Sequence, residues 1–176
     1  MKILLWGVPC VGHEEIGKLL SEKLNYEFID IIDIIKAKYG TIDNYNEKYP
    51  IDYDRFKVVE NIALDIINKK DNFVLSMSFI YIKQIVDNIT NTDTISVEIT
   101  DYLRYIYDRI LFYDENDEVM PNSKEYRDEN KQHFINEIKN DMTASYLEFR
   151  DIPKFKLKGR KFENVIDDLI KFINKI

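Results

Sequence analysis

The stretch that decides the fold runs from residue 2 to residue 14, KILLWGVPCVGHE. Residues 2–6 form a short, mainly apolar run that is long enough for a buried strand. An amphipathic run at residues 15–24 has the spacing of a helix. Between them lies a segment bracketed by two glycines, Gly7-Val8-Pro9-Cys10-Val11-Gly12-His13-Glu14. A strand, a Gly-x4-Gly loop and a helix form the context of a phosphate-binding loop, so we predict such a loop at residues 7–14.

The two residues that follow Gly12 are not those that such a loop uses on its ligand. A phosphate loop continues with Lys, which reaches the phosphates, and with Ser or Thr, whose hydroxyl holds Mg²⁺. Here the two positions hold His13 and Glu14. An imidazole is mostly uncharged at pH 7, and Glu14 and Glu15 bring negative charge to a helix N-terminus that otherwise attracts anions. We expect a loop with the right shape that binds nucleotide weakly.

Glu14 has two interpretations. A carboxylate is a good ligand for Mg²⁺, although it would add negative charge beside the phosphates. The interpretation we favour is that Glu14 and Glu15 stabilise the helix N-terminus. We expect Cys10 to fill space in the loop and His133 to lie at the surface.

Composition sets the class of protein. The chain has 176 residues, 45% hydrophobic and 32% charged, which predicts one globular domain over residues 1–176. A net charge of -7 argues against nucleic acid or an anionic membrane as a partner. One cysteine excludes an internal disulfide, and we expect a cytoplasmic protein.

Strand and helix patterns alternate along the chain, which predicts a parallel sheet with helices on both faces. The expected strands are residues 2–6, 26–29, 73–77, 94–99 and 154–157. The expected helices are residues 15–24, 31–39, 52–68, 79–89, 102–112, 129–149 and 162–176. Residues 113–128 are highly charged and have no apolar period, so they are the candidate for a mobile lid loop. Gly17 lies inside the first helix, where the missing side chain lets the helix approach the sheet.

The chain resembles the shikimate kinase family along nearly its whole length. The resemblance is carried by the glycine-bracketed loop, by Ile16-Gly17-Lys18-Leu19-Leu20 and by Phe28-Ile29-Asp30. It continues in Phe56-Lys57-x-x-Glu60, similar to the family's Phe-Arg-x-x-Glu, and in Gly159-Arg160, similar to its Asp-Gly-Arg near the adenine pocket. It implies a three-layer αβα fold of the P-loop kinase type, whose five-stranded parallel sheet has the order 2-3-1-4-5. It also implies ATP and Mg²⁺ as cofactors, if kinase activity survives.

The departures from the family fall on working residues. The second Asp of the family's substrate pair aligns with Ile32, and Asp33 lies one position further on. A substrate-binding Arg is replaced by Lys57, which loses the planar fork. The family's glycine triplet is replaced by Ser76-Met77-Ser78-Phe79, and its second substrate Arg by Met142 and Thr143.

The resemblance assigns candidate residues to four groups. Relics of the catalytic carboxylates would be Asp30 and Asp33. The substrate pocket would be lined by Asp30, Asp33, Lys57, Glu60, Met77 and Phe79, with Met77 and Phe79 making it smaller and more apolar. The lid and adenine candidates are Arg109 and Arg160. The residues that would hold a metal stay unassigned.

Three functions remain open. The first is a shikimate-kinase-like protein that has lost phosphoryl transfer and binds a nucleotide, a small polar metabolite or a protein partner. The second is a working small-molecule kinase that acts on the alcohol group of a substrate other than shikimate. The third is an interaction module without a ligand. Because phosphoryl transfer depends on positioning and charge, the loss of the loop Lys and hydroxyl favours the first or third.

Overall fold

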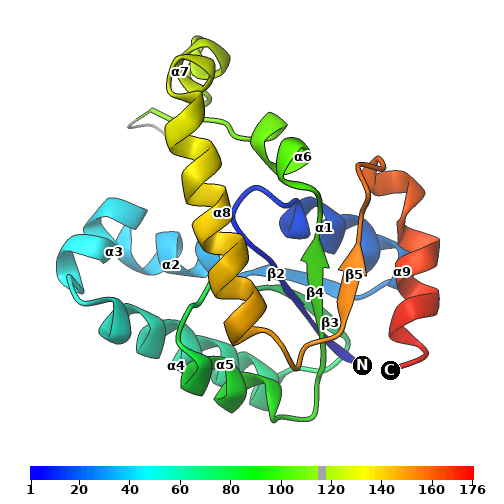
Figure 1. Ribbon diagram of the computed structural model, residues 1–176. Coiled ribbons are helices and arrows are strands. Elements are labelled where there is room, and N and C mark those ends of the chain that lie inside the picture. Colours follow the sequence, from blue (N-terminus) through cyan, green and yellow to red (C-terminus); the bar gives the residue numbers. More distant parts are fainter. Residues whose placement is uncertain (115–117) are drawn as a thin grey trace.

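The computed structural model describes residues 1–114 and 118–176. Its five strands form one parallel sheet of order β2-β3-β1-β4-β5, as predicted (Figure 1). The strands are β1 Lys2–Trp6, β2 Glu27–Asp30, β3 Phe73–Ser76, β4 Ile95–Thr100 and β5 Lys154–Lys156. Each expected strand is confirmed, with ends that move by no more than one residue.

Helices cover both faces of this sheet (Figure 1). They are α1 His13–Leu24, α2 Ile31–Tyr39, α3 Ile42–Lys48, α4 Asp52–Lys69, α5 Lys83–Thr90, α6 Leu103–Asp108, α7 Ser123–Glu129, α8 Lys131–Glu148 and α9 Ile166–Ile173, with a 3-10 turn η1 at Phe162–Asn164. Successive strand residues point to opposite faces, so β1 feeds two apolar cores. Ile3 and Leu5 pack with α1 and α9, whereas Leu4 and Trp6 pack with α4 and α5.

Gly17 lets α1 approach the sheet closely, as the sequence predicted. A Cβ added at Gly17 would lie 2.6 Å from Cε2 of Phe28 and 3.5 Å from Cδ1 of Leu5. A side chain at this position would therefore push α1 off the sheet. Because α1 begins at the loop, its close packing also sets the place of the loop over the strand ends.

One helix was missed in the polar stretch before Pro50. Thr41 caps α3 by accepting a hydrogen bond from the Asn44 N–H at 3.1 Å. Tyr45 is the residue of α3 that is buried, and its hydroxyl donates to the Arg55 carbonyl. With one buried residue α3 has no apolar stripe, so hydrophobic periodicity could not reveal it.

The expected helix at residues 79–89 is wrong in its first turn. The α5 helix begins at Lys83, and residues 79–82 are not helical. The rings of Phe79 and Phe149 contact at 5.8 Å between centroids, and those of Tyr81 and Phe56 at 4.9 Å. These tertiary ring contacts favour a non-helical path. Similarly, residues 162–164 form the turn η1 before α9 rather than the start of one long helix.

The region predicted to be a lid loop, residues 113–128, contains helical structure. Residues 115–117 of this region lie outside the described residues. Ser123 begins α7, and its hydroxyl accepts a hydrogen bond from the Phe112 N–H at 2.7 Å. Arg127 is buried and donates to the Asp108 carbonyl at 2.9 Å. These contacts with the end of α6 stabilise a helix in a segment whose sequence is almost wholly polar.

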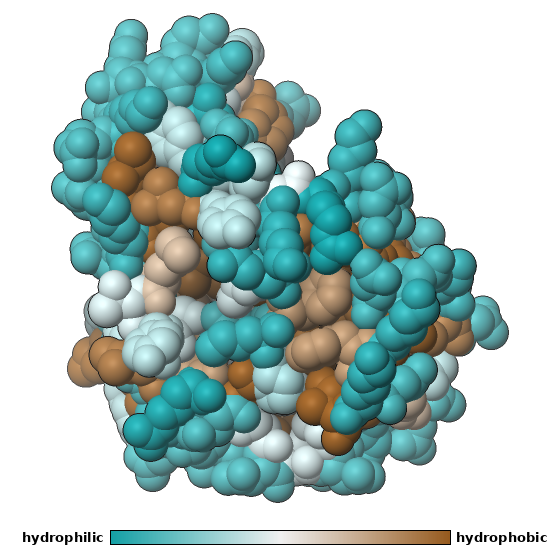
Figure 2. All heavy atoms as spheres, turned by 45° about the vertical axis from the view of Figure 1, so that its right-hand side comes forward, coloured by the Kyte–Doolittle hydropathy of each residue, from teal (hydrophilic) through white to brown (hydrophobic). Residues whose placement is uncertain are grey.

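The surface agrees with the charged composition. Figure 2 shows hydrophilic residues over most of one face, with apolar side chains in patches between them. In the part of the chain that the structure describes, no helix combines the length and the apolar character needed to cross a bilayer.

Candidate functional site

The glycine-bracketed loop lies at the carboxyl end of β1 and leads directly into α1 (Figure 1). Cys10 and Gly12 have φ values of 62° and 95°, so the loop turns twice through the left-handed region. The Val11 N–H donates to the Val8 carbonyl at 3.2 Å, which closes the turn. Gly12 precedes the first helical residue and offers no side chain as a cap. The backbone therefore has the form of an anion-binding loop at a helix N-terminus.

His13 occupies the position of the phosphate-binding lysine, and its ring is turned back over the loop. A Cβ added at Gly7 would lie 3.5 Å from His13 Nδ1, which is buried and without a hydrogen-bond partner among the described residues. Desolvation is the main effect on His13 and lowers the pKa of its imidazole, although the negative charge of Glu14 acts in the opposite direction. The imidazole is therefore neutral near pH 7 and supplies no positive charge to the loop.

Glu14 forms an ion pair with a neighbour on its own helix. Its carboxylate pairs with the Lys18 ammonium at 2.5 Å, one turn along α1. The hydrogen bond to Glu14 raises the pKa of Lys18. Glu14 therefore stabilises the first turn of α1, which is the interpretation that the sequence favoured.

A cavity of about 430 Å³ lies above the loop, between α1, the end of α6 and η1. Its charged lining side chains are the carboxylates of Glu14, Glu15 and Asp108 and the guanidinium of Arg109, so negative charge exceeds positive charge in this lining. Such a wall repels a triphosphate.

The ring of Phe162 covers the loop at this cavity. A Cβ added at Gly12 would lie 2.2 Å from Cζ of Phe162, so the ring lies directly on the backbone of the loop. The guanidinium of Arg109 lies 4.9 Å from the centroid of the same ring. Phe162 is therefore held between Gly12 and Arg109. Sequence patterns did not single out Phe162, because an aromatic residue before an amphipathic helix is an ordinary core signal.

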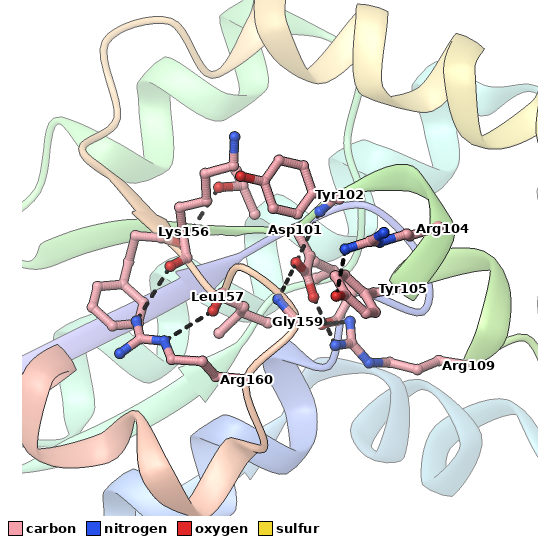
Figure 3. A network of polar contacts seen from close by, with 12 residues as sticks. Asp101, Tyr102, Arg104, Tyr105, Arg109, Lys156, Leu157, Gly159 and Arg160 are labelled. Atoms are coloured by element: carbon pink, nitrogen blue, oxygen red, sulfur yellow. Dashed lines mark hydrogen bonds and ion pairs between the residues drawn. The ribbon is translucent and has the colours of Figure 1, made fainter.

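Asp101 holds Arg109 in this position (Figure 3). Its side chain is 0% exposed, and Oδ2 accepts from Arg109 at 2.7 Å. Oδ1 accepts from the backbone N–H groups of Tyr102 at 2.8 Å and Gly159 at 2.9 Å. Arg109 also donates to the Val11 carbonyl at 3.1 Å. One buried carboxylate thus joins β4, the end of α6, the turn after β5 and the phosphate loop.

The sequence analysis missed Asp101, although a signal for it exists. Asp101 directly follows the fourth strand, at the sheet edge where α/β proteins bind ligands. The lid candidate Arg109 does lie at the loop, but its guanidinium is engaged by Asp101 and Val11. Arg160 extends to the opposite side of Gly159 (Figure 3) and pairs with Asp168 at 2.8 Å.

The candidate catalytic carboxylates lie at the end of β2. Asp30 is buried and caps α2 by accepting from the Ile32 N–H at 2.7 Å. Desolvation raises the pKa of Asp30, and the negative charges of Glu14 and Asp33 add to the effect. Asp33 is exposed in the first turn of α2. The loop and both carboxylates are therefore electrostatically coupled.

The remaining substrate-pocket candidates largely contact one another or the core. Glu60 is buried, pairs with Lys57 and accepts from the Asn88 amide at 2.7 Å. Met77 is 0% exposed within the apolar core on the α4 side of the sheet. Phe79 is half-buried and contacts that core through Phe149. Lys57 and Glu60 thus partner each other, and Met77 acts as a core residue.

The residues present do not make a good Mg²⁺ site. Among the described residues, no group of three or more His, Cys, Asp and Glu side chains is placed to hold a metal ion. The loop has no hydroxyl at position 14, and the carboxylate in its place is paired with Lys18. Glu14 could serve as a ligand for phosphate-bound Mg²⁺ only by giving up this ion pair.

The fold and the loop define a class: a three-layer αβα protein of the P-loop kinase type. Within that class, the resemblance to shikimate kinases is confirmed. The chain is 36% identical over 78 residues to a shikimate kinase of Flavobacterium psychrophilum, a match that spans 43% of this chain and 44% of that protein. No family model matches the chain.

Solved shikimate kinases share the whole fold. The enzyme of Bacteroides thetaiotaomicron superposes with a TM-score of 0.78 at 15% identity, over 99% of this chain and 98% of that chain. The enzyme of Aquifex aeolicus gives a TM-score of 0.73 at 22% identity, over 99% and 97% of the two chains. At these identities the likeness shows the fold and leaves the activity to the site residues.

Proposed function

We propose that this protein uses a kinase fold to bind a small ligand or a protein partner, without ordinary phosphoryl transfer. The observation that carries the proposal is the set of described side chains around the loop, which offers a phosphate no free positive charge. A neutral His13 lies over its start, Phe162 lies on Gly12, and Arg109 is engaged by Asp101.

The physical argument rests on what phosphoryl transfer requires. Catalysis of this reaction comes almost entirely from positioning and from stabilising charge on the phosphoryl oxygens. The loop contributes no lysine and no hydroxyl, and the cavity above it carries Glu14, Glu15 and Asp108. Without the lysine and the hydroxyl, the loop lacks both the positive charge and the metal ligand that the reaction uses.

The test is a direct measurement of ATP and ADP binding by isothermal titration calorimetry, with and without Mg²⁺. We expect no saturation at millimolar nucleotide. Micromolar binding of Mg-ATP to the unmodified protein would contradict the proposal. A matched variant, Phe162→Ala, separates the two causes: tighter binding in this variant shows that the ring blocks the loop, and unchanged binding assigns the weakness to charge.

We further propose that shikimate is not phosphorylated. Recognition of a carboxylate and ring hydroxyls requires several positioned polar partners, and a site that lacks some of them discriminates by about 10⁴ or more. Here Lys57 is paired with Glu60, and Met142 and Thr143 stand where the family has an Arg. A steady-state assay with shikimate and Mg-ATP should give no turnover above background, and an ordinary enzymatic rate would overturn this proposal.

The second candidate is a kinase for another small molecule, and one observation favours it. Asp30 is buried at the strand end beside the loop, and its pKa is raised by desolvation and by Glu14 and Asp33. A carboxylate with a raised pKa near a phosphate loop is suited to accept a proton from a hydroxyl. ATP consumption with a panel of sugars and polyols tests this candidate, with Asp30→Asn as the control variant.

A further inference from the structure

A second, smaller cavity lies at the same edge of the sheet, between the end of β4, α6 and α8. Its volume is about 120 Å³, and Val8 of the phosphate loop forms part of its wall. Asp101 lines this cavity, whereas its partner Arg109 lines the cavity above the loop. The two cavities are therefore separate spaces that meet at one ion pair.

The charged group at the base of the small cavity is fully compensated. Glu98 is 3% exposed, which is costly for a carboxylate unless it is paired. One of its oxygens accepts from the Ser145 hydroxyl of α8, and the other pairs with the Lys154 ammonium of β5. Lys154 also donates to the Phe149 carbonyl at 3.2 Å.

The side chains of Asp101 and Thr100, which also line the cavity, have hydrogen-bond partners as well. Asp101 accepts from Arg109 and from two backbone N–H groups. The Thr100 hydroxyl donates to the Phe155 carbonyl at 3.4 Å. The buried polar side chains of this lining therefore already have hydrogen-bond partners, and none requires one from a ligand. A highly hydroxylated or charged molecule would lose its hydration without replacement hydrogen bonds.

The apolar part of the wall determines what the cavity accepts. Val8 and Ile106 are buried, Met142 lies opposite on α8, and Tyr146 is exposed beside it. Met is flexible and polarisable and makes favourable contacts with aromatic rings. An apolar protein cavity of about 150 Å³ takes up benzene, so this space is of the size of a single ring.

We propose that this cavity binds a small, neutral, largely apolar molecule about as large as one six-membered ring. The inference deepens the proposed function, on which it rests, by naming the ligand class and the place: beside the loop, over β4. It also assigns Met142 as the residue that determines specificity. Where the resemblance implies an arginine for a substrate anion, this chain presents a thioether.

Methionine-methyl NMR with phenol as the probe tests the site directly. The chain has 4 methionines, and Met77 lies in the core on the other face of the sheet. We expect saturable shifts of the Met142 methyl signal at millimolar phenol, with the Met77 and Met120 signals unchanged. No saturable shift at Met142, or equal shifts at Met77 or Met120, would overturn the proposal.

Two variants make the test specific to the cavity. Met142→Trp should fill the space and lower phenol affinity about tenfold or more, whereas the volume-conserving Met142→Leu should keep it within about twofold. Urea unfolding verifies that both variants fold. Equal affinities of the wild type and Met142→Trp would refute the site.

Shikimate serves as the polar counter-probe. We expect it to leave the Met142 signal unchanged, and tighter binding of shikimate than of phenol at Met142 would overturn the ligand class. Nucleotide binding is measured separately, so failure of phenol to bind would leave the conclusion about the phosphate loop untouched. Conversely, micromolar Mg-ATP binding would remove the proposed function, and the phenol titration would still decide whether the cavity binds a single apolar ring.

Discussion

The two cavities at the carboxyl edge of the sheet differ in how their charges are compensated. In the small cavity, the buried Glu98 is matched by Lys154 and Ser145. In the cavity above the loop, Glu15 and Asp108 have no ion-pair partner among the described residues, and the cation that lines it is engaged by Asp101. The charge of Glu98 at the small cavity is therefore balanced, whereas the cavity above the loop carries excess negative charge.

The comparison shows that the backbone shape of a loop and the charges around it are separate properties. The loop keeps the turn that suits a phosphate, yet the side chains around it repel an anion. The cavity over β4 has no motif in the sequence, yet its polar groups are satisfied and its walls are apolar.

The largest expected effect comes from Asp101, which separates the two cavities. Asp101→Ala should lower the free energy of unfolding by about 3–5 kcal/mol, because it removes the ion-pair partner of a partly buried guanidinium and leaves two backbone N–H groups without an acceptor. Asp101→Asn keeps an acceptor for both N–H groups and should cost less, about 1–3 kcal/mol. Urea unfolding measures both. A loss below about 1 kcal/mol for Asp101→Ala would show that the network does not support the sheet edge.

The next effect converts the loop toward anion binding. The double variant His13→Lys, Glu14→Ser should strengthen ATP binding by on the order of 1–3 kcal/mol, because it adds a charge-assisted hydrogen bond and removes a repulsion. Calorimetry with Mg-ATP measures the change. Lys18→Gln alone serves as the control, because it disturbs the ion pair of Glu14 without adding a phosphate ligand. Unchanged affinity in the double variant would mean that Phe162, rather than charge, closes the loop.

A third effect is a dependence of stability on pH. Desolvation lowers the pKa of His13 in the folded protein, whereas an unfolded histidine titrates near about 6.5. Below that pH the unfolded chain binds a proton that the folded chain refuses, so stability should fall as the pH decreases from about 7.5 to about 5.5. Urea unfolding at both pH values should show a smaller fall for His13→Asn.

The other histidine provides the control for this measurement. His133 is exposed on α8, so His133→Asn is the matched variant that removes an imidazole outside the loop. If His133→Asn flattens the profile as much as His13→Asn does, the effect does not come from the loop.

The smallest effect concerns the surface pair of the loop. The side chains of Glu14 and Lys18 are 47% and 51% exposed, so the solvent screens their attraction. Lys18→Gln should change the free energy of unfolding by no more than about 0.5 kcal/mol. A larger loss would indicate that Lys18 compensates the charges of Asp30 and Asp33 as well as that of Glu14.

Local patterns predicted the elements that bury an apolar face. Apolar runs identified β1, β3 and β4, and α2 has the bounds expected for it, residues 31–39. The α3 and α7 helices were not predicted, because they bury few residues. Their stability comes from caps and tertiary hydrogen bonds. Residues 79–82 were misassigned because ring contacts with distant residues outweigh the local helical pattern.

The candidate site was predicted only where a motif marks it. The loop and the replacement of its lysine could be read from adjacent residues, since a phosphate loop is continuous in sequence. Asp101 follows a predicted strand, but its pairing with Arg109 could not be predicted, and neither could the position of Phe162 or the small cavity. These features join residues far apart in the sequence; Arg109 and Val11, for example, are 98 positions apart. The ion pair between Lys57 and Glu60 also depends on side-chain packing.

By itself, the sequence determined the alternating αβ pattern, the loop at residues 7–14 and the absence of its lysine and hydroxyl, because each depends on neighbouring residues or on apolar periodicity. The tertiary structure alone decided that His13 turns over the loop, that Phe162 covers Gly12 and that Asp101 binds Arg109. It also decided that Glu98 is compensated beneath a small apolar cavity. The physical reason is that desolvation and charge compensation depend on which distant groups meet in space, and a linear sequence does not specify those meetings.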